Sequence, residues 1–406
     1  MGADETLSVA VVGAGQAAAA LAAKLRAEGH RGPITLIGAE PAPPYQRPPL
    51  SKKYLLGDLP KERLFLRPQA FWDENDIRLR LGAPVEEIDR AAGRLRLAGG
   101  ESLAWDRLVL ATGARPRRLP ADMGGGLPGV HVLRDLADTE RLGAELRPGA
   151  RALVVGGGYI GLEAAAVFAG RGLQVVLIEA AERILARVAA AETADWFRDL
   201  HAARGVTIRE GAGLLRLEGG DRLRRAVLTD GTALEVDFAL VGIGVVPNDD
   251  LARAAGLAVD GGIDVDGFAA TSDGAVFAVG DVARFGWRGR RIRLESVQNA
   301  IDQAEAAALA ILGRGAPYAP VPWFWSDQYD VKLQIAGLGQ GADRVVTRPG
   351  GRPGAASHWY FKGLELLAVD AMNDPRAYMT GKRWLEAGAS PDPDRLADPG
   401  ADLRTL

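Results

Sequence analysis

Two segments of the chain share one pattern of hydrophobic and polar positions. Each begins with a short run of apolar, largely β-branched residues, continues through closely spaced glycines, and ends in an alanine- and leucine-rich stretch; the segments start at Ser8 and Ala152. A second apolar run follows each of them, over 34–37 and 175–178. A buried strand, a glycine turn, a helix and a second strand form a βαβ unit, so the sequence predicts this unit twice.

The glycine turns have the spacing of dinucleotide-binding folds. The first turn reads Gly13-Ala14-Gly15-Gln16-Ala17-Ala18, and the second reads Gly156-Gly157-Gly158-Tyr159-Ile160-Gly161. One glycine makes the tight turn, one lets the backbone approach a pyrophosphate at the positive helix N-terminus, and the third lets helix and strand pack closely. In the first turn, Ala18 replaces the third glycine.

An acidic residue follows each unit and indicates which nucleotide it takes. Glu179 comes directly after the second strand of the second unit, 18 residues beyond Gly161. A carboxylate there accepts hydrogen bonds from both ribose hydroxyls and repels a 2′-phosphate, so we expect NADH rather than NADPH. Arg183 complicates this, because a nearby arginine can serve a 2′-phosphate. In the first unit the acid is Glu40, which lies after Gly38-Ala39.

Two further strands end in residues that a flavin fold would use. One apolar run leads into Ala111-Thr112-Gly113, and another, over 275–279, leads into Gly280-Asp281. An acid at the carboxyl end of a strand, after a glycine that clears space, can bond a ribityl hydroxyl. Either segment alone also fits an ordinary strand end, and it is their order around the two glycine turns that favours flavin.

Composition excludes several classes of protein. The chain has 406 residues, a net charge of −3 and no cysteine. Thiol catalysis, disulfides and cysteine-bound metal are therefore excluded, and the four histidines are too scattered for a metal motif, so no metal site is predicted. The charge argues against nucleic acid as the main partner. No apolar run reaches the roughly 18–20 residues of a membrane span, and the N-terminus lacks a secretory signal pattern, so we expect a cytoplasmic protein.

The order of these motifs resembles that of flavoproteins with two dinucleotide-binding domains, which share the architecture of glutathione reductase. Three segments narrow the resemblance: 44–52 (PYQRPPLSK), 295–300 (ESVQNA) and 322–329 (PWFWSDQY). They are similar to segments of the FAD-dependent NADH:ferredoxin reductases of oxygenase systems, the family of putidaredoxin reductase and the aromatic dioxygenase reductase components. The match covers essentially the whole chain.

This resemblance implies an α/β fold of the glutathione reductase type with an α+β C-terminal domain, and it implies FAD and NAD as cofactors. The implied boundaries are 1–113 with 248–322 for the FAD domain, 114–247 for the NAD domain and 323–406 for a mostly antiparallel C-terminal domain. The FAD contacts that it implies, besides the first glycine turn and the two strand ends, are Ala39, Glu40, Arg47, Lys52, Val85, Arg134, Ser296, Val297 and Trp325. The NADH contacts that it implies are the second glycine turn with Glu179, and Gly244 and Glu295 near the nicotinamide.

Three residues are candidates for the chemistry itself. Lys52 can pair with Glu163, which lies on the first turn of the NAD-domain helix, because a buried carboxylate without a cation is costly. Both can also be surface residues. Trp325 occupies the position that stands beside the flavin in the family, and alternation along a strand puts Trp323 on the same face. The alternative is a strand that simply packs its aromatic side chains.

The predicted function is electron transfer from NADH through FAD to a small [2Fe–2S] ferredoxin that feeds a monooxygenase or dioxygenase. Since the chain has no cysteine, electrons must leave the flavin directly. One alternative is reduction of rubredoxin or a small quinone-like acceptor. Another, which we rank lower, is a binding protein resembling apoptosis-inducing factor. Candidates for docking an acidic ferredoxin are Arg67, Arg288, Arg290, Arg291, Arg314, Lys332, Lys382 and Arg383.

Overall fold

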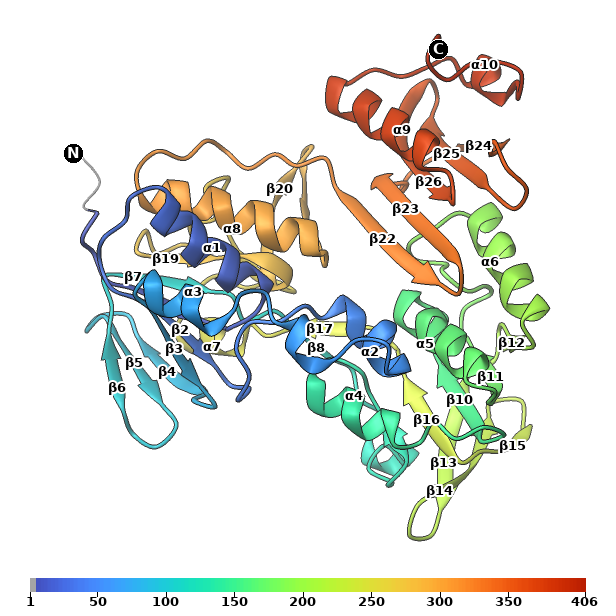
Figure 1. Ribbon diagram of the computed structural model, residues 1–406, viewed down its shortest axis with the longest axis horizontal. Coiled ribbons are helices and arrows are strands. Elements are labelled where there is room, and N and C mark those ends of the chain that lie inside the picture. Colours follow the sequence, from blue (N-terminus) through green and yellow to red (C-terminus); the bar gives the residue numbers. More distant parts are fainter. Residues whose placement is uncertain (1–4) are drawn as a thin grey trace. The chain divides into compact units, whose positions relative to one another are not determined.

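The computed structural model describes residues 5–406, which divide into two compact units. Unit 1 comprises 5–46, Lys61–Arg115 and Val245–Pro320; unit 2 comprises Arg47–Pro60, Pro116–Gly244 and Val321–Leu406. Most helices and strands of both are labelled in Figure 1. Within 5–406, no helix is both long enough and apolar enough to cross a membrane. Each unit is described by itself below.

Unit 1 is built on a parallel sheet of five strands. Its order is β19 (Val276–Ala278), β7 (Arg107–Leu110), β1 (Val9–Val12), β2 (Ile34–Gly38) and β3 (Ile77–Leu81), and every pairing is parallel. The strands β1 and β2 are buried along their whole length, as expected of a sheet covered on both faces. Helix α1 (Gln16–Ala27) connects them, so the first predicted βαβ unit is confirmed.

Helix α1 packs against α8 (Val297–Ile311), which lies beside it in Figure 1. The facing surfaces are rich in small side chains: Ala18 and Ala22 on α1 and Ala304 and Ala308 on α8 are all fully buried. Small residues let two helices approach closely, so the alanine-rich pattern of both segments has a packing role. The core also holds leucine and valine side chains from the sheet.

The remaining elements of unit 1 are short. An antiparallel sheet holds β4 (Val85–Asp89), β5 (Arg94–Leu97) and β6 (Ser102–Ala104), and another sheet holds β18 (Ile263–Asp264), β20 (Ala283–Trp287) and β21 (Arg290–Ile292). A two-stranded pair joins β8 (Ala114–Pro116) and β17 (Val245–Pro247). The helices are α3 (Gln69–Glu74) and α7 (Asp250–Ala254), with 3-10 turns η2 (Lys61–Leu64) and η4 (Gly280–Val282).

Unit 2 repeats the nucleotide-binding plan. Its parallel sheet has the order β12 (Thr207–Arg209), β11 (Gln174–Ile178), β10 (Arg151–Val155), β16 (Phe238–Val241) and β9 (Val130–His131). Helix α5 (Tyr159–Gly170) links β10 to β11, which confirms the second predicted βαβ unit. The other elements are α4 (Leu136–Gly143), α6 (Ala191–Ala203), the turn η3 (Ala121–Met123) and an antiparallel sheet of β13 (Leu214–Gly219), β14 (Leu223–Leu228) and β15 (Ala233–Glu235).

The C-terminal part of unit 2 is a five-stranded sheet in which every pairing is antiparallel, as expected from the sequence. Its order is β22 (Trp323–Gln328), β23 (Val331–Gly337), β26 (Glu365–Met372), β25 (Ala356–Lys362) and β24 (Arg344–Pro349). Helices α9 (Pro375–Ala387) and α10 (Pro393–Ala397) complete it. Its core combines aliphatic and aromatic side chains, with Trp359 and Phe361 fully buried.

A short segment of unit 2 comes from the N-terminal part of the sequence. It consists of the 3-10 turn η1 (Pro48–Ser51) and helix α2 (Lys53–Leu56), and η1 packs against α5. Leu55 enters the same core as Leu142 and Leu162. This packing fixes the backbone of the segment, and therefore of Ser51 and Lys52, against the nucleotide-binding sheet.

Candidate active site

The first glycine turn has the conformation that a bound pyrophosphate requires. Gly13 has φ +120°, and a Cβ there would lie 2.2 Å from the carbonyl oxygen of Ala111, so no larger residue fits. At Gly15, the N-cap of α1, a Cβ would meet no described atom within 4 Å. The start of α1 therefore leaves room beside Gly15, as the approach of an anion to a helix N-terminus needs. Ala18, fully buried, completes the helix–strand packing.

Three predicted segments meet at one edge of the sheet of unit 1. The strands β1, β7 and β19 are neighbours and parallel, so Gly13, the run Ala111–Gly113 and Gly280 follow their carboxyl ends together. Gly280, at φ +75°, donates its amide to the Oε1 of buried Gln303 over 2.8 Å, and half-buried Asp281 comes next. Thr112 is held by Asn248 through two hydrogen bonds of 2.7 and 2.8 Å. Ligands of parallel sheets bind at such edges.

The acid of the first unit lies at the same edge. Strand β2 ends at Gly38, beside β1, and Glu40 follows it. The Oε2 of Glu40 accepts a 2.6 Å hydrogen bond from the Tyr45 hydroxyl, which fixes the carboxylate. Ala39 is exposed, and Val85 lies at the start of β4, in a different sheet from this edge.

Helix α8 supplies a further N-terminus in unit 1. Ser296 is its N-cap, and the Ser296 Oγ accepts from the amide of Asn299 at 3.1 Å. The first turn, which begins at Val297, has no acidic residue. Glu295 is exposed and pairs with Arg293 at 2.7 Å. The amides at the start of α8 thus keep their partial positive charge.

The second glycine turn, in unit 2, is the more complete of the two. Gly156 has φ +107°, and a Cβ there would lie 2.5 Å from the Gly242 oxygen. A Cβ at Gly161 would lie 2.1 Å from the Gly156 oxygen, while one at Gly158 would meet no described atom within 4 Å. The three glycines therefore have the geometry that their predicted roles require: Gly156 makes the tight turn, Gly158 leaves room for a ligand, and Gly161 allows the close contact between helix and strand. Gly244, at φ +95°, follows β16.

Glu179 and Arg183 occupy different environments beside this turn. The carboxylate of Glu179 accepts from the amide of Gly157 at 2.7 Å and from that of Ala181 at 2.8 Å. The guanidinium of Arg183 instead turns to backbone carbonyls, with its shortest bond, 2.9 Å, to Ala189. Three further carbonyls lie at 3.4–3.5 Å from it. Arg183 therefore holds the loop that follows it, whereas Glu179 borders the glycine turn.

The predicted pair of Lys52 and Glu163 is present. Lys52 Nζ lies 2.6 Å from Glu163 Oε2, with side chains 15% and 2% exposed. Sequence reasoning missed two further donors to this carboxylate. The Ser51 hydroxyl donates to Oε2 at 2.6 Å, and the Ser326 hydroxyl donates to Oε1 at 2.7 Å. A carboxylate this deeply buried requires such donors.

The predicted arginine and tryptophan residues of unit 2 also have defined partners. Arg47 donates to the backbone oxygen of Arg134 at 2.8 Å, so these two predicted residues lie together. The rings of Trp323 and Trp325 are 5.7 Å apart, as alternation along one strand predicts, and both are half-buried. Between them in sequence, Phe324 stacks at 4.9 Å on Tyr159 of the glycine turn. Strand β22 thus places aromatic rings against the nucleotide-binding turn of its own unit.

The basic residues predicted to dock a ferredoxin differ in the contacts that they make within the protein. Arg314 pairs with Glu5 and Glu28, and Arg291 pairs with Asp264. Four others lie over aromatic rings: Arg67 over Phe71, Arg288 and Arg290 over Trp287, and Lys382 over Trp323. Lys332 and Arg383 are exposed. Lys382 and Arg383 share helix α9, so they form the pair of adjacent basic candidates in unit 2.

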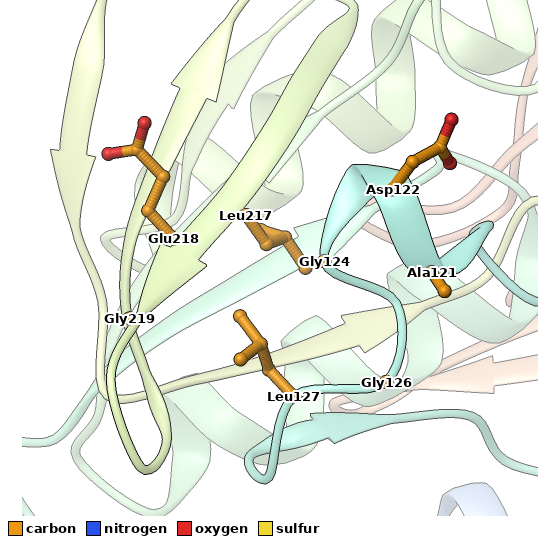
Figure 2. A pocket seen from close by; sticks show the side chains of 8 residues that line it. All are labelled: Ala121, Asp122, Gly124, Gly126, Leu127, Leu217, Glu218 and Gly219. Atoms are coloured by element: carbon orange, nitrogen blue, oxygen red, sulfur yellow. The ribbon is translucent and has the colours of Figure 1, made fainter.

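An open depression of about 380 Å³ lies on unit 2 between η3 and β13 (Figure 2). In Figure 2 the side chains of Leu127 and Leu217 lie between those of Glu218 and Asp122, and all four residues line the depression. None of the residues that line it is a predicted site residue. Glu218 is paired with Arg216 and Arg225. The depression offers two acids and small residues, without the glycine turn or the cation that a nucleotide would use.

Two nucleotide-binding folds with open glycine turns, together with a buried lysine–glutamate pair, define a nicotinamide-dependent flavoprotein oxidoreductase. The chain belongs to the pyridine nucleotide-disulphide oxidoreductase family, whose model matches residues 7–304, and the reductase C-terminal model matches 323–406. Proteins of this family use FAD and NAD(P)H. The glycine turns of both units fit the pyrophosphates of these two cofactors.

The similarity to known reductases extends over the full chain. Rhodocoxin reductase of Rhodococcus erythropolis is 42% identical over 98% of this chain and 94% of its own. The ferredoxin–NAD(+) reductase component of the anthranilate 1,2-dioxygenase system of Burkholderia cepacia is 41% identical, with 98% of each chain covered. The solved covalent complex of putidaredoxin reductase with putidaredoxin matches with a TM-score of 0.94 at 38% identity, covering 98% of this chain and 97% of the other.

Proposed function

We propose that the protein passes electrons from NADH through FAD to a small [2Fe–2S] ferredoxin that feeds a monooxygenase or dioxygenase. The observation that carries this proposal is a chain with two nucleotide-binding folds and no cysteine. Disulfide reductases of this architecture work through a redox-active cysteine pair, which this chain cannot supply. Electrons therefore leave the flavin directly. The relative from the anthranilate 1,2-dioxygenase system is named a ferredoxin–NAD(+) reductase component, which supports an iron–sulfur protein as the acceptor.

FAD supplies the ability to accept two electrons together from the nicotinamide and to release them singly. The residues of the chain supply binding and electrostatics. In unit 1, the amides of the first glycine turn would hold the pyrophosphate, Glu40 would bond the ribose, and Asp281 would bond the ribityl chain. The amides at the start of α8, from Val297 onward, would stabilise negative charge on a bound flavin ring.

Lys52 and Glu163 form the fixed ion pair that we assign to the reaction. Lys52 is the cation, and Glu163 holds it because the carboxylate has few other ways to be neutralised at 2% exposure. Two serine hydroxyls fix the carboxylate in turn. The pair thus offers a positive charge in one defined position, which costs no rearrangement during the reaction.

NADH is the preferred donor. Glu179 borders the glycine turn, where its carboxylate can bond the ribose hydroxyls and would repel a 2′-phosphate. Arg183 is engaged by backbone carbonyls, which supports NADH because that guanidinium is turned away from the role that NADPH would require.

The other assignments made from the resemblance are part of the same proposal. They are Ala39, Arg47, Val85, Arg134 and Trp325 for FAD, Gly244 and Glu295 for the nicotinamide, the three-domain division at 113/114, 247/248 and 322/323, and a place in the cytoplasm. For Arg47 and Arg134, their mutual hydrogen bond supports a shared role.

Steady-state oxidation of NADH by the FAD-loaded enzyme tests the function. Several [2Fe–2S] ferredoxins are compared with a rubredoxin and a quinone, with ferricyanide as the control for flavin turnover. We expect at least one ferredoxin to be reduced with a kcat/KM well above that of the quinone. If rubredoxin or quinone is the better acceptor while ferricyanide turnover is normal, the ferredoxin assignment is wrong.

A further inference from the structure

A continuous chain of polar side chains leads from Glu163 through the interior of unit 2. Ser326 donates to Glu163, and the Gln328 Nε2 donates to the Ser326 Oγ at 3.2 Å. The Oε1 of Gln328 lies 2.8 Å from the Nε2 of His201, and the His201 Nδ1 lies 3.0 Å from the Tyr329 hydroxyl. Ser326, Gln328 and His201 are each fully buried.

The hydrogen bonds of this chain run in one direction. A carboxylate accepts only, so the single proton of the Ser326 hydroxyl is committed to Glu163. Ser326 must then accept from the amide nitrogen of Gln328, which leaves the Gln328 oxygen to accept from the Nε2–H of His201. The Nδ1 of His201 is therefore free to accept from Tyr329. Every donor points toward Glu163.

The protonation state of His201 agrees with this order. The chain requires a neutral imidazole, with one donor and one acceptor nitrogen. Burial lowers the pKa of His201 from its ordinary value, which favours the neutral ring. At the outer end, Tyr329 is half-buried under the guanidinium of Arg204, which pairs with Asp330 at 2.7 Å.

The side chains of this hydrogen-bonded series come from three different elements of unit 2. Glu163 lies on α5, His201 on α6, and Ser326 and Gln328 on the buried face of β22. Packing alone would be served as well by apolar side chains, since buried polar groups gain little stability over a hydrophobic replacement. What an apolar β22 could not do is donate to Glu163.

We propose that Ser326, Gln328 and His201 are positioning residues, which orient the Glu163 carboxylate and through it the Lys52 ammonium. The inference rests on the proposed function in one respect: it takes the Lys52–Glu163 pair to lie at the site of electron transfer. It extends that function by assigning part of the reductive half-reaction to the C-terminal sheet, which provides β22.

The first test measures how firmly Lys52 is held, without any turnover. The FAD-loaded protein is treated with a trace of acetic anhydride, and mass spectrometry compares acetylation of Lys52 with that of Lys53, its exposed neighbour and internal standard. Ser326→Ala removes one of the two serine donors to Glu163, the one at the head of this series of side chains. We expect it to raise the Lys52/Lys53 ratio roughly tenfold, the effect of one lost bond to a charged group. Gln328→Met, His201→Phe and Tyr329→Phe should raise it by progressively smaller factors.

A matched control removes an equivalent buried hydroxyl that does not lead to Glu163. Ser357 is fully buried on β25 of the same sheet, and its Oγ accepts from Trp359 Nε1 at 3.0 Å. Ser357→Ala should leave the Lys52/Lys53 ratio unchanged. His201→Gln can donate and accept in the same direction, so it should restore the ratio that His201→Phe raises.

Stopped-flow reduction of the flavin by NADH provides the second readout. Ser326→Ala should lower the limiting rate constant several-fold with little change in the Kd for NADH, whereas Ser357→Ala should alter neither. Equal Lys52 acetylation and equal flavin reduction in the two alanine variants would overturn the inference. Failure of wild type to reduce any ferredoxin would overturn the proposed function instead, since neither readout contains a ferredoxin.

Discussion

Replacing Lys52 with methionine leaves the Glu163 carboxylate buried without its cation. The two side chains are 15% and 2% exposed and lie 2.6 Å apart, so water cannot take the place of the ammonium. Methionine keeps the length and the apolar stem of the lysine, so the change removes mainly the charge. The loss of stability therefore measures the free-energy cost of burying the Glu163 carboxylate without a cation.

The size of the effect follows from the surroundings of the carboxylate. Removing one partner of a buried ion pair costs about 3–5 kcal/mol. Ser51 and Ser326 still donate to Glu163 in the variant, so we expect the lower end of that range, about 3 kcal/mol. For a unit of roughly 150–250 residues each kcal/mol lowers Tm by about 2–4 °C, which gives a fall of about 6–12 °C.

Calorimetry on samples of equal flavin content measures this fall. The control is Arg344→Met, which breaks an exposed pair in the same unit: Arg344 and Asp394 lie 2.7 Å apart but are 42% and 84% exposed. An exposed pair contributes at most about 1 kcal/mol, so Tm should change by less than about 4 °C. The double variant Lys52→Met/Glu163→Gln should recover part of the loss, because an amide needs no cation.

Two outcomes would refute the reasoning. The first is a Lys52→Met variant that melts as the Arg344→Met control does, which would mean that Glu163 is solvated despite its burial. The second is a double variant less stable than Lys52→Met alone, which would mean that the carboxylate, rather than its charge balance, stabilises the fold.

Three further outcomes can be measured on the same protein. Glu179→Ala should reduce the ratio of kcat/KM for NADH to that for NADPH roughly 10- to 150-fold, the effect of losing a hydrogen bond to a charged group. A wild type that uses the two nucleotides equally well would contradict the role given to Glu179. Burial lowers the pKa of His358 to about 4 and raises the pKa of Asp370 to about 6. As the pH falls from 6.5 to 4, the unfolded chain protonates its histidine more readily than the folded protein does, so His358 lowers the free energy of unfolding. Over the same range the folded protein protonates Asp370 more readily than the unfolded chain does, so Asp370 raises the free energy of unfolding. Over that range Asp370→Asn should therefore make Tm fall more steeply and His358→Asn should make it rise relative to wild type; parallel Tm curves would count against both assignments. The rate of ferredoxin reduction, but not the rate of flavin reduction by NADH, should fall as salt rises above about 0.15 M. Arg383→Ala should raise the apparent KM for ferredoxin, whereas Arg314→Ala should not, because Arg314 is already paired with two glutamates. A rate of ferredoxin reduction that does not change with salt would mean that docking rests on apolar contacts.

Much of the fold was predictable because its signals are local in sequence. A buried strand, a glycine turn and a helix occupy about twenty consecutive residues, so both βαβ units were found from their pattern alone. The Lys52–Glu163 pair was also predicted, since a carboxylate buried near the start of α5 is costly without a cation. Alternation along 323–325 correctly placed two tryptophan rings together.

The serine donors to Glu163 were not predicted because a neutral hydroxyl, unlike the Lys52 ammonium, carries no charge that points to a carboxylate remote in sequence. Ser51 is 112 residues away and Ser326 is 163. One signal was available: the alternation that put Trp323 and Trp325 on one face of a strand puts Ser326 and Gln328 on the other. That face is buried, and two polar residues in succession on a buried face require partners. His201, dismissed as a metal ligand because the histidines are scattered, is one of those partners.

Helix α6 shows how unit 2 separates stability from chemistry. Its fully buried Thr193 bonds His358 and Asp370, each at 2.8 Å, and its fully buried His201 bonds Gln328, so both ends of one helix are tied to the C-terminal sheet through polar groups. Both ties fix the register between helix and sheet, but only the second continues to Glu163. A substitution at Thr193 should therefore lower Tm without altering Lys52, whereas a substitution at His201 should do both. The contacts of Thr193 and of His201 join the same helix to the same sheet and are equally buried. Comparing the Tm and the Lys52 acetylation of variants at the two positions therefore separates the orientation of the Lys52–Glu163 pair from the stability of unit 2.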